Sequence, residues 1–365
     1  MGSALAVVTA EVSEEIKAAE EAGLRYFIPK GEGITRRRSG SSFVYLDPQG
    51  KPIRDQKTLL RIRSLVIPPA WTSVWISPRA NGHIQAVGRD AKGRKQYRYH
   101  PAYRQARDLA KFDRMLAFGS ALPRIRRAVS RDLRLRGMPK EKVLAAVVRL
   151  LETTYIRVGN EEYVEENGSF GLTTLRNQHV QVLGDTLKFE FRGKSHQHHV
   201  IKVQDKRLAR IVRLCKDIPG SSLFEYIDND GKPQVLESGD VNDYLRTISG
   251  GEFSAKDFRT WGGTCLAANL LLAQVQNSDT EAAKAVKSVL VEVVKNVACK
   301  LGNKPSTCRK YYIHPTILEA FESGTLHGIA ESVRDSRGKY LYEKVVLSMI
   351  KPLKRAAAKR KAAAA

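Results

Sequence analysis

The spacing of apolar positions divides the chain into a first part with short strand-like runs and a longer part with helical periodicity. A charged helical pattern at 12–22 comes first, and from Tyr26 short apolar runs alternate with turn residues. Because turn residues such as Pro, Gly, Asn and Asp border these runs, they predict strands at 43–46, 71–76 and 82–88. From Pro101 onward, apolar residues recur at helical spacing. We therefore expect an N-terminal extension at 1–24, a small β-rich domain at 25–102, a larger mainly helical domain at 103–350 and a basic tail at 351–365.

Two patterns in the larger part put cations at the ends of predicted elements. The run Pro139–Tyr155 has its apolar residues on one helical face, and we expect Gly159 to end this helix, with Arg157 beside the end. Three strand-like runs follow, at 179–183, 186–192 and 197–203. Lys194 then lies at the tip of the second hairpin. Neither pattern identifies a site by itself, because such cations more often serve as salt-bridge partners or are solvated.

The remaining candidate site residues lie at the start of one predicted helix and just after the end of another. Ser254 and Asp257 are typical of a capping pair, flanked by two phenylalanines at the spacing of a hydrophobic staple. This start holds Lys256 and Arg259 in the first turns, where the helix dipole favours an anion. A second amphipathic run, 280–301, ends at a glycine and leads into the segment 303–312, Asn-Lys-Pro-Ser-Thr-Cys-Arg-Lys-Tyr-Tyr.

The charge of the chain indicates a polyanionic partner. Its 365 residues include 62 Lys and Arg against 38 Asp and Glu, a formal net charge of +24. Nucleic acid is the expected partner, because phosphate neutralisation supplies most nonspecific affinity; the alternative is a basic protein that merely stays soluble. In the β-rich part Gln96, Tyr97 and Tyr99 are interleaved with cations, which suits contact with phosphates and base edges. The alternative is a twisted strand whose tyrosines belong to the core.

Several other classes of function are not indicated. The four cysteines are far apart with no Cys-x-x-Cys pair, so we expect neither disulfides nor a cysteine zinc site, and a reducing, cytoplasmic location. His198 and His199 face opposite sides of a strand, which disfavours a metal site at this histidine cluster. No Gly-x-x-x-x-Gly-Lys loop is present, so we expect no ATP use. No signal peptide and no membrane-spanning run is recognisable.

The residues singled out above occur in an order that resembles a known family. Arg157-Val158-Gly159, Gly193-Lys194, Lys256-Asp257-Phe258-Arg259 and the segment 303–312 follow one another as in type IB DNA topoisomerases, specifically the poxvirus-like and bacterial branch. The similarity runs from about Tyr26 to about Phe321. Lys-Asp-Phe-Arg-Thr-Trp and Pro-Ser-x-x-Arg-Lys-x-Tyr are the specific stretches, whereas Gly-Lys alone is weak.

The resemblance implies a role for each catalytic candidate. Tyr312, which lies nine positions after Asn303 as in the family, would attack the scissile phosphorus and become joined to the 3′ phosphate. Arg157 and Arg259 would hold the nonbridging oxygens, and Lys194 would protonate the departing 5′ oxygen. Asn303 stands where poxvirus enzymes carry histidine and would donate a neutral hydrogen bond. Supercoils of both signs would relax without ATP, metal or cofactor, because the phosphotyrosine linkage conserves the phosphodiester bond.

The resemblance also implies partners and architecture. The expected fold is α+β, with the β-rich module and the mainly helical catalytic domain closing as a clamp around double-stranded DNA. Tyr163 matches a DNA-contacting tyrosine, whereas Asn160 replaces a lysine, and Lys256 is expected to contact DNA. We expect a nucleoid-associated monomer whose tail adds nonspecific affinity. Two alternatives remain: a tyrosine recombinase or integrase, which typically has histidine where Lys256 stands, and a noncatalytic DNA-binding protein.

Overall fold

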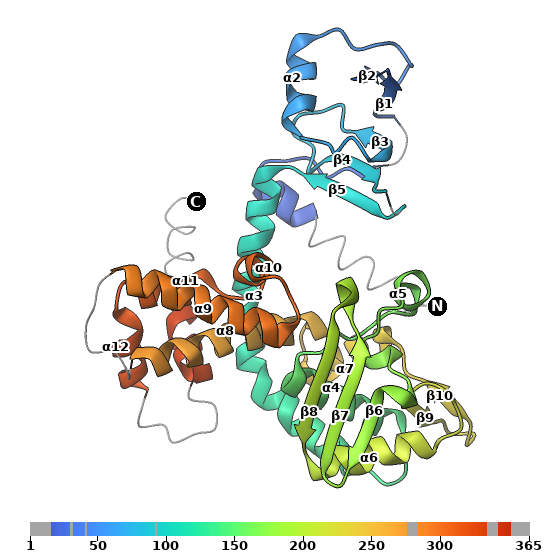
Figure 1. Ribbon diagram of the computed structural model, residues 1–365, viewed down its shortest axis with the longest axis vertical. Helices are drawn as coiled ribbons and strands as arrows, with labels where there is room; N and C mark the ends of the chain where they lie inside the picture. Colours follow the sequence, from blue (N-terminus) through green and yellow to red (C-terminus); the bar gives the residue numbers. More distant parts are fainter. Residues whose placement is uncertain are drawn as a thin grey trace. The chain divides into compact units, whose positions relative to one another are not determined.

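A computed structural model describes residues 16–29, 32–40, 42–91, 93–275, 283–333 and 342–351. Close contacts divide the chain into two units, Met1–Phe112 and Asp113–Ala365, and each is described by itself. The predicted α+β class is confirmed: a small sheet module precedes a larger, mainly helical part (Figure 1). Within the described residues, no helix combines the length and apolar character that crossing a membrane requires.

The first unit is built on an antiparallel sheet of five strands in the order β2-β1-β3-β4-β5. The strands are β1 (Ile34–Ser39), β2 (Ser42–Leu46), β3 (Thr72–Ile76), β4 (Ile84–Arg89) and β5 (Lys95–Tyr99), and α2 (Gln56–Ser64) lies between β2 and β3. Ile34, Ile62, Val74, Ile76 and Ala86 form its buried core. The sequence patterns did not identify β1, because only Ile34 of its six residues is buried and the rest of the strand reads as a basic surface run.

The second unit combines a helical core with two small sheets. The three-stranded sheet has the order β6-β7-β8, formed by β6 (Val180–Leu183), β7 (Thr186–Arg192) and β8 (His198–Gln204), and β9 (Glu225–Ile227) pairs with β10 (Pro233–Val235). After the long α3 (Pro101–Asp132), which begins in the first unit, the helices are α4 (Lys140–Thr154), α5 (Glu161–Asn167), α6 (Lys206–Asp217), α7 (Ser238–Ser249), α8 (Ala255–Val275), α9 (Ala283–Leu301), α10 (Pro305–Tyr311), α11 (Pro315–Glu322) and α12 (Thr325–Ser332). Residues 342–351 are also helical.

Helix α4 is the centre of the second unit. Val143, Ala145, Val147 and Leu150 are fully buried along it. It packs against α6, α7, α8 and β8 (Figure 1). Helix α8, which carries Arg259, and strand β8, which follows the turn with Lys194, therefore contact the same buried helix. This burial on nearly all sides explains why its sequence is apolar well beyond a single face.

The end of α4 differs from the prediction. Gly159 does not end the helix; α4 stops at Thr154, and Tyr155 adopts the left-handed conformation with φ of 58°. The chain then pairs with a distant segment, because Leu172 and Thr173 donate to the carbonyls of Arg157 and Val158 at 2.8 and 2.7 Å. Arg157 is therefore held by this pairing rather than by the helix itself.

Candidate functional site

The tyrosine segment is attached to α8 by its backbone. Pro305 begins α10, the helix ends at Tyr311, and Tyr312, whose side chain is half-buried, is its C-cap. Thr264 of α8 donates to the Tyr312 carbonyl at 3.2 Å and accepts from the His314 N–H at 3.0 Å. A Cβ at Gly263 would lie 2.6 Å from the same carbonyl, so only glycine permits this close approach. Helix α8 thus positions the backbone on both sides of the Tyr312 side chain.

Arg259 lies in the first turns of the same helix and meets the tyrosine ring. Its guanidinium is 5.2 Å from the ring centroid of Tyr312, and its side chain is buried. Its two Nη atoms donate to the carbonyls of Tyr155 and, at 2.7 Å, Leu301, and its buried Nε has no hydrogen-bond partner among the described residues. Burial lowers the pKa of Arg259, and Tyr312 partly offsets this effect. Because an arginine side chain keeps its charge at neutral pH, Arg259 places a cation against the tyrosine ring.

The predicted start of α8 is present. The Asp257 carboxylate accepts from the Ser254 N–H at 2.8 Å and from its hydroxyl at 3.2 Å. Phe253 and Phe258 both pack edge-on against Phe118, with centroids 5.4 and 5.0 Å away. This packing fixes the turn that carries Arg259. Lys256 on the same turn is exposed and does not line the pocket described below.

Arg157 and Asn303 form the second pair of the site. The Arg157 Nη2 donates to Asn303 Oδ1 at 2.5 Å and to the Gly302 carbonyl at 3.4 Å. Burial and, to a smaller extent, the nearby Arg259 lower the pKa of Arg157 and Tyr312 acts in the opposite direction, with a net pKa of about 10. At neutral pH Arg157 is still charged. Within the part of the chain that the structure describes, the buried amide Nδ2 of Asn303 has no hydrogen-bond partner, so a donor is left for a ligand.

Lys194 lies in the turn between β7 and β8, as the hairpin pattern predicts. Its side chain is exposed, and the ammonium is 5.7 Å from the ring centroid of Tyr163, which follows the start of α5. One small pocket is lined by Arg157, Lys194 and Arg259 together. Residues from the loop after α4, the β7–β8 turn and α8 therefore line the same pocket. Asn303 accepts a hydrogen bond from Arg157, and the ring of Tyr312 packs against Arg259.

His199, which the sequence patterns did not mark as a site residue, also lines this pocket. His198 points outward and lies 3.4 Å from Glu190, whereas the half-buried His199 stacks on Phe191 with centroids 5.1 Å apart. Strand alternation, which puts His199 on the same face as Ile201, was the available signal. In the described part of the chain no three potential metal-ligating side chains form a cluster.

The DNA-binding candidates of the first unit have mixed environments. Tyr97 is exposed and stacks on Tyr99 at 5.8 Å, whereas Tyr99 also packs near Tyr103 at 5.5 Å. Gln96 donates to Asp90 at 3.0 Å. The tyrosine pair thus combines an exposed ring with one that joins a small core.

Part of the basic surface of this unit is structural. Arg36 donates to several backbone carbonyls between Ile67 and Trp71, Arg61 donates to the Ser77 carbonyl at 2.7 Å, and Arg98 donates to the Val66 carbonyl at 2.9 Å. These arginines hold their own module together, so the density of cations in the sequence overstates the charge available to a ligand.

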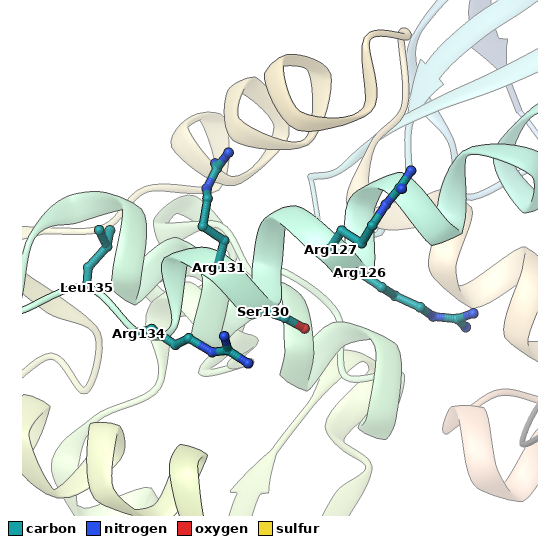
Figure 2. A pocket seen from close by; sticks show the side chains of 6 residues that line it. All are labelled: Arg126, Arg127, Ser130, Arg131, Arg134 and Leu135. Carbon is teal, nitrogen blue, oxygen red and sulfur yellow. The ribbon is translucent and has the colours of Figure 1, made fainter.

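A second basic surface lies at the C-terminal end of α3. Figure 2 shows four arginines around a shallow pocket: Arg126, Arg127 and Arg131 of the helix, and Arg134, which follows its end. Arg126 is bound by two glutamates and Arg131 by Asp132, whereas no described acid pairs with Arg127 or Arg134. This surface adds positive potential outside the pocket that Arg157, Lys194 and Arg259 line.

Comparison with known proteins identifies relatives along most of the chain. The family profile of the catalytic core of eukaryotic DNA topoisomerase I matches residues 100–337, and that of the N-terminal domain of bacterial DNA topoisomerase IB matches residues 42–90. DNA topoisomerase 1B of Acanthamoeba polyphaga mimivirus is 31% identical over 296 residues, which cover 80% of this chain and 88% of the viral protein. DNA topoisomerase 1B of vaccinia virus (strain Copenhagen) is 28% identical over 237 residues, covering 64% of this chain and 71% of that protein.

Proposed function

This chain belongs to the type IB DNA topoisomerases, and from that premise we propose that it relaxes positive and negative supercoils through a transient 3′-phosphotyrosyl bond to Tyr312. The observation that carries the proposal is the convergence of Arg157, Lys194 and Arg259 on one pocket, with Tyr312 against Arg259. A phenol is a poor nucleophile at neutral pH, and adjacent cations offset this by stabilising the charge that develops on the phosphate.

In the first step the Tyr312 oxygen forms a bond to the scissile phosphorus and the bond from phosphorus to the 5′ oxygen breaks. Arg157 and Arg259 hold the nonbridging oxygens, with the unpaired Nε of Arg259 and the unpaired Nδ2 of Asn303 as available donors. Charge stabilisation by fixed side-chain cations is the main requirement of phosphoryl transfer, so no nucleotide or metal is needed in this scheme.

Lys194 supplies the proton that the departing 5′ oxygen needs, since an alkoxide is a poor leaving group. Its exposed position on the β7–β8 turn supports a mobile donor that reaches the substrate once DNA is bound. The phenol proton passes to solvent. After the free 5′ end has rotated about the intact strand, the 5′ hydroxyl attacks the phosphotyrosine and the same groups act in reverse.

The test is relaxation of supercoiled plasmid in excess EDTA without ATP, with a denaturing trap for covalent adducts. We expect relaxation of both signs and a 3′-linked adduct, both lost in Tyr312→Phe with DNA binding retained. Tyr311→Phe is the matched control, because the neighbouring ring is partly exposed and has the same chemistry. An adduct without relaxation would favour a tyrosine recombinase, and neither would favour a noncatalytic DNA-binding protein.

We further propose that the chain acts as a monomer that closes around duplex DNA and resides with the chromosome in the cytoplasm. DNA binding itself follows from the family. Sedimentation of the free protein tests the oligomeric state, and a stable dimer would contradict it.

A further inference from the structure

We propose that His199 is a further catalytic residue of this site, one that donates a hydrogen bond to a nonbridging oxygen of the scissile phosphate. The inference rests on the function proposed above. It assigns a role to a histidine that neither the ordered motifs nor the arginine, lysine and tyrosine chemistry uses.

The first support is the position of the imidazole between two active-site turns. A Cβ at Gly193 would lie 2.6 Å from His199 Nε2, and a Cβ at Gly302 would lie 2.3 Å from His199 Cε1. Gly193 directly precedes Lys194, and Gly302 directly precedes Asn303. The two glycines therefore admit the ring between the turns that carry the proposed acid and the amide donor.

The second support is that the ring nitrogens have no hydrogen-bond partner in the described part of the chain. The only contact of the side chain there beyond packing is its stack on Phe191, at an interplanar angle of 19°. A half-buried imidazole with no internal hydrogen bond keeps its donor for a ligand. A bound anion would bring acceptor atoms to this ring, and also to the buried, unpaired Nδ2 of Asn303 and Nε of Arg259.

The third support is the charge of the groups around the ring. The titratable residues that line the pocket with His199 are Arg157 after α4, Lys194 on the β7–β8 turn, Arg259 on α8, Lys300 on α9 and Tyr155 at the end of α4. None of the described lining residues is a carboxylate. Such a set attracts an anion and gives a neutral imidazole N–H only one kind of acceptor, an oxygen of that anion.

The same surroundings predict the direction of a pH effect. Burial lowers the pKa of His199, and Arg157, Arg259 and the neighbouring His198 lower it further. A bound phosphate adds negative charge and raises this pKa again. The complex then takes up a proton more readily than the free protein, so the contact from His199 strengthens as the pH falls.

The test compares substitutions that separate the ring from its hydrogen bond. His199→Phe keeps the stack on Phe191 and removes the donor, His199→Gln keeps a donor, and His199→Met is the second donor-free variant should the phenylalanine protein fail to fold. His198→Phe is the matched control, because that neighbour lies on the other face of β8 and pairs with Glu190. Single-turnover cleavage is measured on a duplex that traps the adduct, and affinity is measured in a Tyr312→Phe background.

We expect His199→Phe to slow cleavage by about 10- to 100-fold, the lower part of the range for loss of one oxyanion donor. The DNA affinity of His199→Phe should change by less than about 2-fold. His199→Gln should cleave within about 5-fold of the parent rate, and His198→Phe should cleave at the parent rate. The deficit of His199→Phe should grow as the pH falls from 7.5 to about 6.

A substrate with a methylphosphonate at the scissile position tests whether His199 contacts a nonbridging oxygen. Replacing a nonbridging oxygen with methyl removes the acceptor, so the penalty of His199→Phe should shrink to less than about 3-fold on that substrate. A full penalty on methylphosphonate, or equal losses in His199→Phe and His199→Gln, would overturn the proposal in favour of packing. Parent-like cleavage by His199→Phe would also overturn the role of His199, although an adduct formed by the parent would still support the proposed function. If the parent itself formed no adduct, the proposed function would be contradicted.

Discussion

Substituting Thr264→Val tests whether α8 positions the nucleophile through its backbone. Thr264 is fully buried, and its hydroxyl accepts from the His314 N–H at 3.0 Å while its proton is shared between the carbonyls of Tyr312, at 3.2 Å, and Thr260, at 3.0 Å. Valine keeps the shape of the side chain but cannot accept from that N–H. A buried donor left unsatisfied costs about 1–3 kcal/mol.

This cost has two expected consequences. The melting temperature should fall by roughly 2–4 °C for each kcal/mol in a domain of this size. A shift of about 1 Å in the Tyr312 backbone would slow cleavage by up to about 100-fold, because transfer to phosphorus needs a close, aligned approach. Religation should slow by a similar factor, since the same groups act in both directions. DNA affinity should stay within about 2-fold, because the contact lies inside the protein.

Two further variants separate positioning from general damage. Thr264→Ser retains the hydroxyl and should restore the cleavage rate to within about 3-fold. Thr260→Val is the matched control: it is buried one turn earlier on α8, and its hydroxyl makes only a 3.4 Å contact to the Lys256 carbonyl. Parent-like cleavage by Thr264→Val, or an equal loss in Thr260→Val, would refute the reasoning.

Three other perturbations have defined outcomes. Burial lowers the pKa of His314 to about 4, so the folded state binds its proton less readily than the unfolded chain. The free energy of unfolding should therefore fall by about 3 kcal/mol as the pH drops from 6.5 to 4. His314→Asn keeps an acceptor for the N–H of Thr316 but does not titrate, so urea titrations at pH 7.5 and 4.5 should show a smaller loss of stability for this variant than for the parent. Glu343→Gln removes one of the acceptors that bind Arg126 at 2.9 and 2.7 Å and should cost about 1–3 kcal/mol of unfolding free energy, whereas an unchanged denaturation midpoint would show that the pair is dispensable. Asn303→His should raise the ratio of variant to parent cleavage rates as the pH falls, because the new imidazole gains a charge that the amide cannot; a flat ratio in the pH–rate profile would contradict this.

Local sequence patterns were sufficient to predict those elements whose ends depend on a few neighbouring residues. The proline and glycine punctuation around 303–312, the Ser254–Asp257 cap and the hairpin at Lys194 all depend on interactions within a few residues. The patterns were insufficient for α4, where Tyr155 rather than Gly159 ends the helix, in the left-handed conformation. A non-glycine residue adopts it there because Arg259 donates to its carbonyl and a Cβ at Gly262 would clash with its ring.

What the sequence by itself determined about this protein is an excess of cations that suits a polyanion and an ordered set of motifs that identifies the family, including the tyrosine that we propose for the covalent step. What only the tertiary structure decided is which groups are available. Arg36, Arg61 and Arg98 contribute to the positive charge of the sequence but donate to backbone carbonyls. His199, by contrast, lines the pocket with Arg157 and Arg259 and makes no hydrogen bond with the described residues. The physical reason is that a side chain's role depends on its hydrogen-bond partners and burial, and these come from segments far apart in the chain.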